Sequence, residues 1–358
     1  MKNTYPNYYK KFSCIADKCT DTCCAGWDVV VDGESLEKYN NLGTNYGEKI
    51  RSLITIDEDG DSIFISQNGK CPFLLSSGLC EMYKELGHDN LCRTCRMFPR
   101  FINAFGARSE TGISLSCPEA ARLIFENSDP VTFETEDTNS EIIPSDFDAE
   151  LYFTLLDARK KAIAVIQQRN FSIRQRICAF AEYSQALQQL IDDDRLDDAK
   201  QLDANSFLNR NYKYSAAKSK RALGKIFSDY GSLEFINADF TDKLANAETV
   251  DIQGFSAPDW EYEQLMVYFI FRYFITAAYD YDLLTKVKFA VVSFIVISRL
   301  HASCDALEKQ QRTEISQKYS KETEHSAINM DYLFSAMKKS RYYGIHNLIN
   351  ILSEGENI

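Results

Sequence analysis

Nine of the eleven cysteines lie between residues 14 and 117, and this clustering constrains the fold more than any other feature. The other two, Cys178 and Cys304, are isolated in a chain of 358 residues. Cysteines that act only as small apolar core residues have no reason to gather in one segment. Thiolate sulfur is a soft ligand that zinc and iron–sulfur clusters prefer. The clustering therefore predicts a metal-binding region near the amino end.

The cellular compartment decides how this cysteine count is interpreted. The first residues, MKNTYPNYYKKFSC, contain no apolar segment of the kind found in secretion signals. The longest apolar run, from Phe289 to Ile297, is shorter than the roughly 20 residues that cross a bilayer. We therefore expect a cytoplasmic protein without a membrane span, whose thiols stay reduced. An odd number of cysteines in such a compartment argues against a disulfide framework.

The net charge of -12 bears on the class of partner. Proteins that bind nucleic acid in general carry a basic face that neutralises phosphates, and this chain is acidic overall. The same charge disfavours docking on an anionic membrane surface. We expect neither nucleic acid nor membrane among the partners.

The spacing of the cysteines suits a metal site and leaves the metal open. Spacers of two to four residues let two thiolates reach one centre from a single turn. An all-thiolate set, with His88 as the one histidine nearby, favours a [4Fe–4S] cluster, and zinc with four cysteines is the alternative. Adjacent side chains diverge, so Cys23 and Cys24 are not expected to bind one ion together. The candidate metal ligands are Cys14, Cys19, Cys23, Cys24, Cys71, Cys80, Cys92, Cys95 and Cys117.

Nine thiols exceed the four that a single site of either kind requires. Either two sites exist, or several of these cysteines are not ligands.

Sequence patterning divides the chain into three parts. Residues 1–125 contain the cysteine cluster and two β-branched runs, 28–32 and 62–66, which predict short strands. Residues 126–148 have eight acidic residues, two prolines and no lysine or arginine, which predicts an acidic linker or surface loop. From 149 to 358 the pattern is helical. The predicted fold is α+β and mostly α: a cysteine-rich metal-binding domain with short strands, followed by a helical domain.

Apolar periodicity predicts the main helices of the second half. One stripe runs from Leu151 to Ile166, and Ser172 is the expected N-cap of the next helix. Two segments that are apolar nearly all round, split near residues 279–282, should lie at the centre of the fold. A last helix near 331–339 is expected to close it. The polar region between these segments, 192–250, is interpreted as a solvated face.

Five segments of the cysteine-rich part are FSCIADKCTDTCCAGWDVVVD at 12–32, CPFL at 71–74, CEMY at 80–83, LCRTCRMFPR at 91–100 and LSCPEAARLIF at 115–125. They resemble the flagellin lysine-N-methylase family, within a wider group of cysteine-rich zinc- or iron-chelating proteins. The wider group has tighter cysteine spacing and would not by itself imply methylation. The segment YFIFRYFITAAYDYDLLTKVKFAVVSFIVIS at 268–298 also resembles the methylase family.

The resemblance implies a specific enzyme activity. It implies methyl transfer from S-adenosylmethionine to lysine side chains of flagellin, in a protein with a cysteine-bound iron–sulfur cluster. The shared motifs make the pairs Cys19 with Cys23 and Cys92 with Cys95 the first choices as ligands.

The sequence shows no recognisable motif for binding S-adenosylmethionine. No Gly-rich loop of the Rossmann type occurs, and the C-x3-C-x2-C loop of radical enzymes is absent. We therefore expect polar methyl transfer, with the cluster in a structural or positioning role. The 20 tyrosines and 23 phenylalanines could supply faces for a sulfonium or methylammonium cation, although core packing accounts for most of them.

Arg272 stands out because it interrupts an apolar run, YFIFRYF. A buried arginine needs an anionic partner, and Asp280 or Asp282 is the expected one. Contact with the carboxylate of a bound cofactor is the alternative role for Arg272. Trp27 is expected to anchor the cysteine-rich fold, and Asp21 to be a solvated loop residue. The active site is expected between the two domains, where pockets often form.

Two other classes of function remain open. The main rival is a non-enzymatic metal-binding or cluster-carrier protein. The other is an oxidoreductase, for which no flavin or nicotinamide fingerprint is present.

Overall fold

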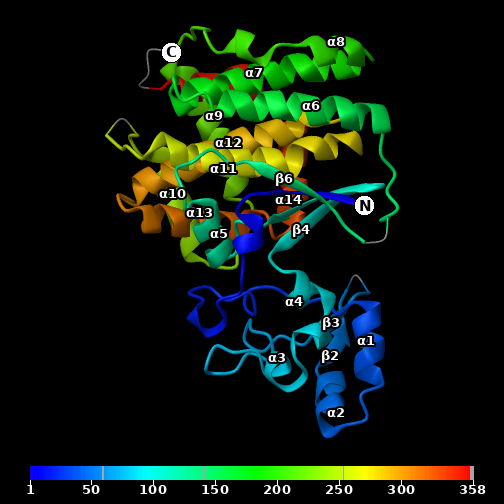
Figure 1. Cartoon of the computed structure of the whole chain (residues 1–358). Helices are drawn as coiled ribbons and strands as arrows, with labels where there is room; N and C mark the ends of the chain where they lie inside the picture. The colour runs from blue at the N-terminus through cyan, green and yellow to red at the C-terminus, as the bar shows by residue number, and fades with distance from the viewer. Residues whose placement is uncertain (59, 140–141, 253, 355–358) are drawn as a thin grey trace.

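The computed structural model describes residues 1–58, 60–139, 142–252 and 254–354. Helices make up 56% of the chain and the strands are few, which confirms the α+β, mostly α prediction. Figure 1 shows the helical body, a sheet lying against one side of it, and beyond the sheet the segment that carries α1 to α4.

The main sheet has four strands in the order β4-β5-β1-β6. Strand β1 pairs parallel to β5 and antiparallel to β6, and β4 pairs antiparallel to β5. A separate two-stranded sheet joins β2 and β3. The strands are β1 (Lys2–Pro6), β2 (Ile54–Ile56), β3 (Ser62–Phe64), β4 (Arg100–Phe105), β5 (Arg108–Ile113) and β6 (Phe133–Asp137).

The short strands of the cysteine-rich part match the prediction only in part. Strand β3 lies in the run 62–66, as predicted. The run 28–32 forms no strand, and contributes an isolated bridge from Val30 to Ile63. Strand β6 lies within the acidic segment 126–148, so this segment supplies a sheet edge in addition to loops. The proposed division into domains stays a prediction.

In the amino-terminal part, short helices alternate with loops. They are α1 (Gly33–Asn40), α2 (Asn45–Ser52), α3 (Glu81–Leu86), α4 (Arg93–Met97) and α5 (Pro118–Ile124). The helices of the body are longer. They are α6 (Ala149–Ile166), α7 (Ile173–Asp192), α8 (Leu196–Gln201), α9 (Ala216–Tyr230), α10 (Asp239–Thr249), α11 (Asp259–Tyr273), α12 (Leu283–Ser303), α13 (Lys309–Thr323), α14 (Ala327–Lys339) and α15 (Ile345–Leu352).

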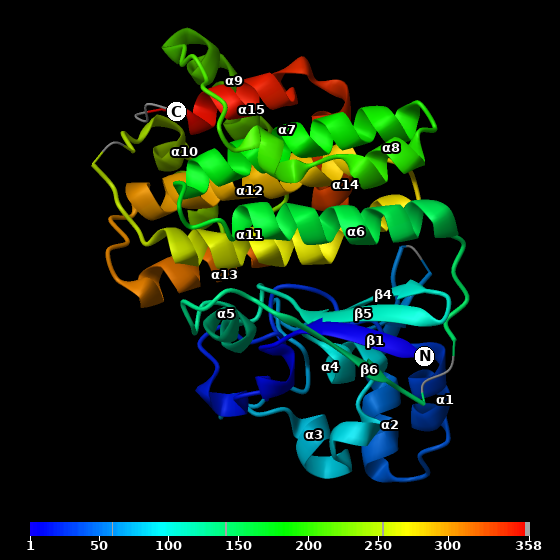
Figure 2. The ribbon, with the colours of Figure 1, turned by 45° about the horizontal axis from the view of Figure 1, so that its top comes forward.

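The predicted helices form at the positions that the N-cap residue and the apolar periodicity indicate. The hydroxyl of Ser172 accepts the Gln175 backbone N–H, and the Gln175 side chain accepts the Ser172 N–H, which completes a capping box. Helices α11 and α12 are buried nearly all round and lie inside the body (Figure 2), as predicted. Among the described residues no helix is both long and apolar enough to cross a bilayer.

Several helices of the body escaped the prediction from sequence. Helices α8, α9 and α10 lie in the polar region 192–250, and α15 follows the helix that was expected to be last. Helix α13 is a case of a different kind, because the side chains that it buries are mostly polar, among them Arg312, Gln317 and Lys321. A helix that buries polar groups has no apolar stripe for a periodicity argument to detect.

The structure has two hydrophobic cores. The large core joins the helical body to the main sheet, and includes Phe105 and Ile113 from the strands. The small core lies within the cysteine-rich part and is made by Val29, Val31, Tyr39, Ile50, Phe64, Phe73, Met82, Leu91 and Cys92. The cysteine-rich part therefore has a core of its own, which supports its loops independently of the helical body.

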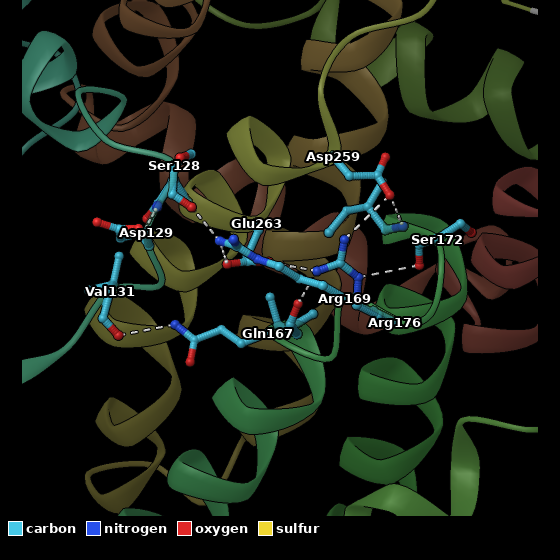
Figure 3. A network of polar contacts seen from close by, with 12 residues as sticks. Ser128, Asp129, Val131, Gln167, Arg169, Ser172, Arg176, Asp259 and Glu263 are labelled. Atoms are coloured by element: carbon cyan, nitrogen blue, oxygen red, sulfur yellow. Dashed lines mark hydrogen bonds and ion pairs between the residues drawn. The ribbon is translucent and has the colours of Figure 1, made fainter.

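A network of buried charges holds α7 and α11 together (Figure 3). The Glu263 carboxylate, with 1% of its side chain exposed, accepts hydrogen bonds from Arg169 at 2.7 and 3.0 Å and from Arg176 at 2.7 Å. Arg176 is equally buried and also lies 3.4 Å from Asp259, which is half exposed. Arg169 in addition donates to the Ser128 carbonyl. Each buried charge thus has an opposite charge against it, as burial requires.

The buried imidazole of His301 makes stability depend on pH. Burial lowers its pKa from 6.5 to about 3, and the ring lies against Tyr262 and the Arg312 carbonyl. Between these pH values the unfolded chain takes up a proton at this residue and the folded chain does not. The contribution of His301 to the free energy of unfolding should therefore fall as the pH drops below 6.5, by about 1 kcal/mol per pH unit, and be constant above it.

Urea unfolding at pH 7.5 and 5.0 measures this dependence. His301→Gln, which cannot protonate, should lose less stability than the parent between the two pH values. The same change at the exposed His346 should leave the dependence intact. Equal pH dependence in the parent and His301→Gln would show that the prediction is wrong.

Candidate functional site

Three of the predicted ligands stand at the N-caps of short helices. Cys80, Cys92 and Cys117 cap α3, α4 and α5. None of the three side chains makes a capping hydrogen bond. Burial raises the pKa of Cys80 and Cys117 in spite of the nearby backbone N–H groups, whereas the pKa of Cys92 is lowered by Cys95. Of the three caps, only Cys92 therefore lies where the thiolate is favoured.

Four thiols lie where the cysteine-rich part meets the helical body. We call Cys14, Cys19, Cys23 and Cys117 the junction group. Burial raises the pKa of Cys117 to about 11, and the neighbouring thiols Cys19 and Cys14 raise it further. Burial likewise raises the pKa of Cys19, whose thiol donates to the Asp21 carbonyl at 3.4 Å.

Five thiols lie around the small core. We call Cys24, Cys71, Cys80, Cys92 and Cys95 the small-core group. Burial raises the pKa of Cys71 to about 12, with further contributions from Cys24, Cys80 and Cys92. Cys71, Cys80 and Cys95 pack against the small core, which contains Cys92.

Cys23 and Cys24 affect each other's acidity: Cys23 lowers the pKa of Cys24 to about 6, whereas Cys24 and burial raise the pKa of Cys23. In the same way Cys95 lowers the pKa of Cys92. The expectation that Cys23 and Cys24 do not bind one ion together stays a prediction.

Thiol sulfur is a donor that soft metals prefer. The eleven cysteines all lie in the described part of the chain, and none of them forms a disulfide. Among the residues that the structure describes, no three ligating side chains stand in position to hold one metal ion. The metal and the identity of its ligands stay predictions.

Aromatic rings stack where the cysteine-rich part meets the helical body. The His325 ring, just after α13, stacks on Trp27 with centroids 4.3 Å apart and on Phe98 at 5.3 Å. Packing of the ring, followed by the positive charges of Arg272 and Lys321, lowers the pKa of His325 to about 4 although the residue keeps an exposed edge. Trp27 is half-buried and thus contacts the body as well as its own loop.

A polar cluster next to this stack ties the cysteine loop to α13. The Lys321 ammonium lies 2.5 Å from Asp21 and 5.0 Å from the centre of the Trp27 ring. The Gln317 amide donates to both Asp21, at 2.9 Å, and the Ser116 carbonyl, at 2.7 Å. Asp21 is therefore an anchor between the two parts, where solvation had been expected.

Arg272 lies in the same region, and its predicted partners are wrong. Its ion pair is with Glu324, at 3.1 Å, a carboxylate with none of its side chain exposed. Asp280 binds Lys286 at 2.7 Å, and Asp282 caps α12. These aspartates follow Arg272 closely in sequence, but the turn after α11 carries them to the start of α12.

The remaining contacts of Arg272 and Glu324 complete a closed cluster. Arg272 donates to the Ser114 hydroxyl at 2.9 Å and lies over the rings of Phe101 and Tyr273. Glu324 accepts from Tyr273 at 2.6 Å and from Tyr268 at 3.1 Å. The arrangement joins the end of β5 to α11 and α13. A role for Arg272 in binding a cofactor carboxylate stays a prediction.

Several junction residues carried no signal in the sequence. Lys321, Glu324 and His325 belong to the polar run of α13 and its end, where ion pairs over long sequence separations decide the packing. Pairing of Asp21 with Lys321, 300 residues apart, has no local pattern to reveal it.

Fold and site together define a helical protein with a thiol-rich module docked on it through an aromatic and ionic junction. The profile of the FliB lysine N-methylase C-terminal domain matches residues 159–351, more than half of the chain. The chain belongs to the FliB lysine N-methylase family, which confirms the resemblance. The matched region runs from α6 to α15 and includes Arg272 and His325, but none of the nine clustered cysteines.

Named relatives agree with this assignment. A lysine-N-methylase of Salmonella typhimurium is 30% identical over 138 residues, which cover 35% of this chain and 33% of that protein. The flagellar biosynthetic protein FliU of Salmonella muenchen is 30% identical over 138 residues, 35% of this chain and 78% of that protein. The match thus spans about a third of the lysine-N-methylase. No solved structure matches the chain.

Proposed function

We propose that this protein transfers methyl groups from S-adenosylmethionine to lysine side chains of flagellin, in the cytoplasm. The observation that carries the proposal is the family match over residues 159–351. The names of the relatives, a lysine-N-methylase and a flagellar biosynthetic protein, favour lysine as the acceptor and a flagellar protein as its carrier.

The junction offers what methyl transfer to lysine requires. Only about one lysine in 10³ is neutral at pH 7, so the site must favour loss of the ammonium proton and hold cations beside it. Trp27, Phe98 and His325 bring aromatic rings together from three separate segments, and the Lys321 ammonium lies 5.0 Å from the centre of the Trp27 ring, as a bound cation would. Aromatic faces hold cations with about 0.5–2 kcal/mol each. This stack is therefore our candidate for the place where a sulfonium or lysine side chain docks.

The same proposal includes a cysteine-held iron–sulfur cluster. Its support is the all-thiolate donor set and the resemblance of the cysteine motifs. In the bound state such a cluster would order the loops that carry Trp27 and Asp21, because binding energy at a thiolate site is also folding energy.

Methyl incorporation tests the function directly. Anaerobically prepared protein is incubated with labelled S-adenosylmethionine and purified flagellin, and lysines are examined by mass spectrometry. Mono- or dimethylated lysines that depend on the protein are expected. Cluster-replete protein that binds metal yet incorporates no methyl would favour the rival reading, a non-enzymatic metal-binding or cluster-carrier protein.

The two tryptophans of the chain provide a matched pair of variants. Trp27→Ala removes one ring of the stack and should lower kcat/KM for flagellin about tenfold, which corresponds to about 1.4 kcal/mol of cation binding. Trp260→Ala is the control, since Trp260 is also half-buried with a lysine ammonium over its ring, at 5.8 Å, but stands at the start of α11 away from the stack. Equal effects of the two changes would remove the stack from the active site.

A further inference from the structure

We propose that Lys321, on the chain's own helix α13, occupies the place of the substrate lysine in the junction, so that a substrate lysine enters by displacing it. The inference rests on the proposed function, because it takes the stack of Trp27, Phe98 and His325 as the place where a lysine docks. It adds a regulation of that site: the protein keeps a lysine of its own on the recognition groups until the substrate replaces it.

The Lys321 ammonium has the surroundings that recognition of an alkylammonium group requires. It lies 2.5 Å from a carboxylate oxygen of Asp21 and 5.0 Å from the centre of the Trp27 ring. An accepting carboxylate and an aromatic ring are contacts with which proteins hold such cations. The Lys321 side chain is 4% exposed, so these two groups replace water that the ammonium has lost. A substrate lysine has the same side chain and would use the same two groups.

Lys321 is held by few bonds for a buried cation. An ammonium has three N–H donors, and among the described residues Asp21 is the one hydrogen-bond acceptor of Lys321. Arg272, in the same region, is bonded to both Glu324 and Ser114. Its carboxylate partner has none of its side chain exposed, so that pair is shielded from solvent. Lys321 is therefore the more readily exchanged of the two cations.

Asp21 can keep its position while the cation bound to it changes. Its two carboxylate oxygens have different partners, because Lys321 binds Oδ1 and the Gln317 amide binds Oδ2 at 2.9 Å. The same amide donates to the Ser116 carbonyl at 2.7 Å, just before α5. Departure of Lys321 thus leaves the carboxylate anchored through Oδ2, with Oδ1 able to accept from another ammonium.

The recognition groups reach the surface, whereas Lys321 does not. The Asp21 side chain is 26% exposed, Trp27 is half-buried and His325 is exposed. A lysine of a partner protein can therefore approach the carboxylate and the stack from solvent. Lys321 approaches from the helical body, and its four-carbon stem is flexible, so the ammonium can leave Asp21 while α13 stays in place.

Steady-state kinetics with flagellin test the displacement. Lys321→Met keeps an unbranched side chain and removes the competing charge, so KM for flagellin should fall. A fall of about tenfold corresponds to Lys321 holding the site in about nine molecules of ten. Lys321→Arg restores a cation that binds a carboxylate through two N–H groups, and should return KM to the parent value or above it. An unchanged or higher KM in folded Lys321→Met would overturn the inference.

Lys309→Met is the matched control for these variants. The Lys309 ammonium also lies over a tryptophan ring, that of Trp260 at 5.8 Å, but it lies outside the junction and forms no ion pair among the described residues. Removing this charge should leave KM for flagellin at the parent value. An equal fall in KM for Lys309→Met and Lys321→Met would show a general effect of charge and contradict displacement at the stack.

Amine labelling of the parent protein is a second test, which needs neither a variant nor turnover. Lysines are acetylated with N-hydroxysuccinimidyl acetate, and each acetylated lysine is quantified by mass spectrometry with and without flagellin, whose binding is measured in parallel. Displacement should raise the labelling of Lys321 severalfold and leave that of Lys309 unchanged. Unchanged or lower labelling of Lys321 in the complex would overturn the inference.

The two tests tell failure of this inference apart from failure of the proposed function. Exposure of Lys321 by bound flagellin, in a protein that incorporates no methyl, would support displacement and contradict methyl transfer. Methyl incorporation without added labelling of Lys321, and with an unchanged KM in Lys321→Met, would support the enzyme and contradict displacement. Absence of flagellin binding would contradict both.

Discussion

Replacing Glu263 by glutamine should lower the free energy of unfolding by about 3–5 kcal/mol, because it leaves a buried guanidinium without its counter-charge. Glu263 neutralises both Arg169 and Arg176, and Arg176 has 1% of its side chain exposed (Figure 3). Glutamine has the same shape, so little packing changes. What remains for Arg176 is the Ile166 carbonyl at 2.6 Å, the Ser172 carbonyl at 3.4 Å and one more distant carboxylate. Urea unfolding measures the loss.

Asp259→Asn is the matched control for this change. Asp259 also faces Arg176, but at 3.4 Å and with about half of its side chain exposed, so solvent screens the pair. Asparagine can still accept the Ile173 backbone N–H that Asp259 binds at 2.8 Å. We expect a loss of about 1 kcal/mol or less. A loss for Glu263→Gln no larger than that of Asp259→Asn would mean that the buried network does not hold α7 to α11.

The sequence revealed those parts of the fold whose packing is apolar. Helix α7 has a cap and a stripe, and α11 and α12 are apolar on every side, so periodicity and capping located them. Helix α13 buries Arg312 against Glu261 and His301. Its polar sequence gives no hint of burial, because the partners that make burial possible come from other helices. A helix that packs through polar side chains therefore cannot be recognised as buried from the sequence alone.

The candidate site, like the fold, could be predicted from the sequence only in part. The clustered cysteines can be recognised as candidate metal ligands because their residue type alone carries the chemistry. How their loops are held depends on residues such as Gln317, a residue of ordinary type whose two hydrogen bonds reach back to Asp21 and Ser116. The partner of Arg272 was sought nearby in sequence, while the structure supplies Glu324 from another helix. Local spacing identifies donors; the fold decides which donors meet.

Arg272→Leu should lower the free energy of unfolding by about 3–5 kcal/mol, since it leaves the Glu324 carboxylate buried with two tyrosine hydroxyls and no cation paired to it. The double variant Arg272→Leu with Glu324→Leu should recover a large part of this loss, because both charges are then absent. Urea unfolding of the parent, the two single variants and the double variant gives the coupling energy. Additive losses would show that the pair is not the source of the effect.

Binding of S-adenosylmethionine separates the structural role of Arg272 from the cofactor role. Arg272→Lys keeps the positive charge opposite Glu324 but loses the planar fork that also reaches Ser114. If Arg272 only holds the junction together, Arg272→Lys should fold and bind S-adenosylmethionine with nearly the parent Kd in calorimetry. A Kd raised tenfold or more in a variant whose stability is close to that of the parent would instead place the guanidinium on the cofactor carboxylate.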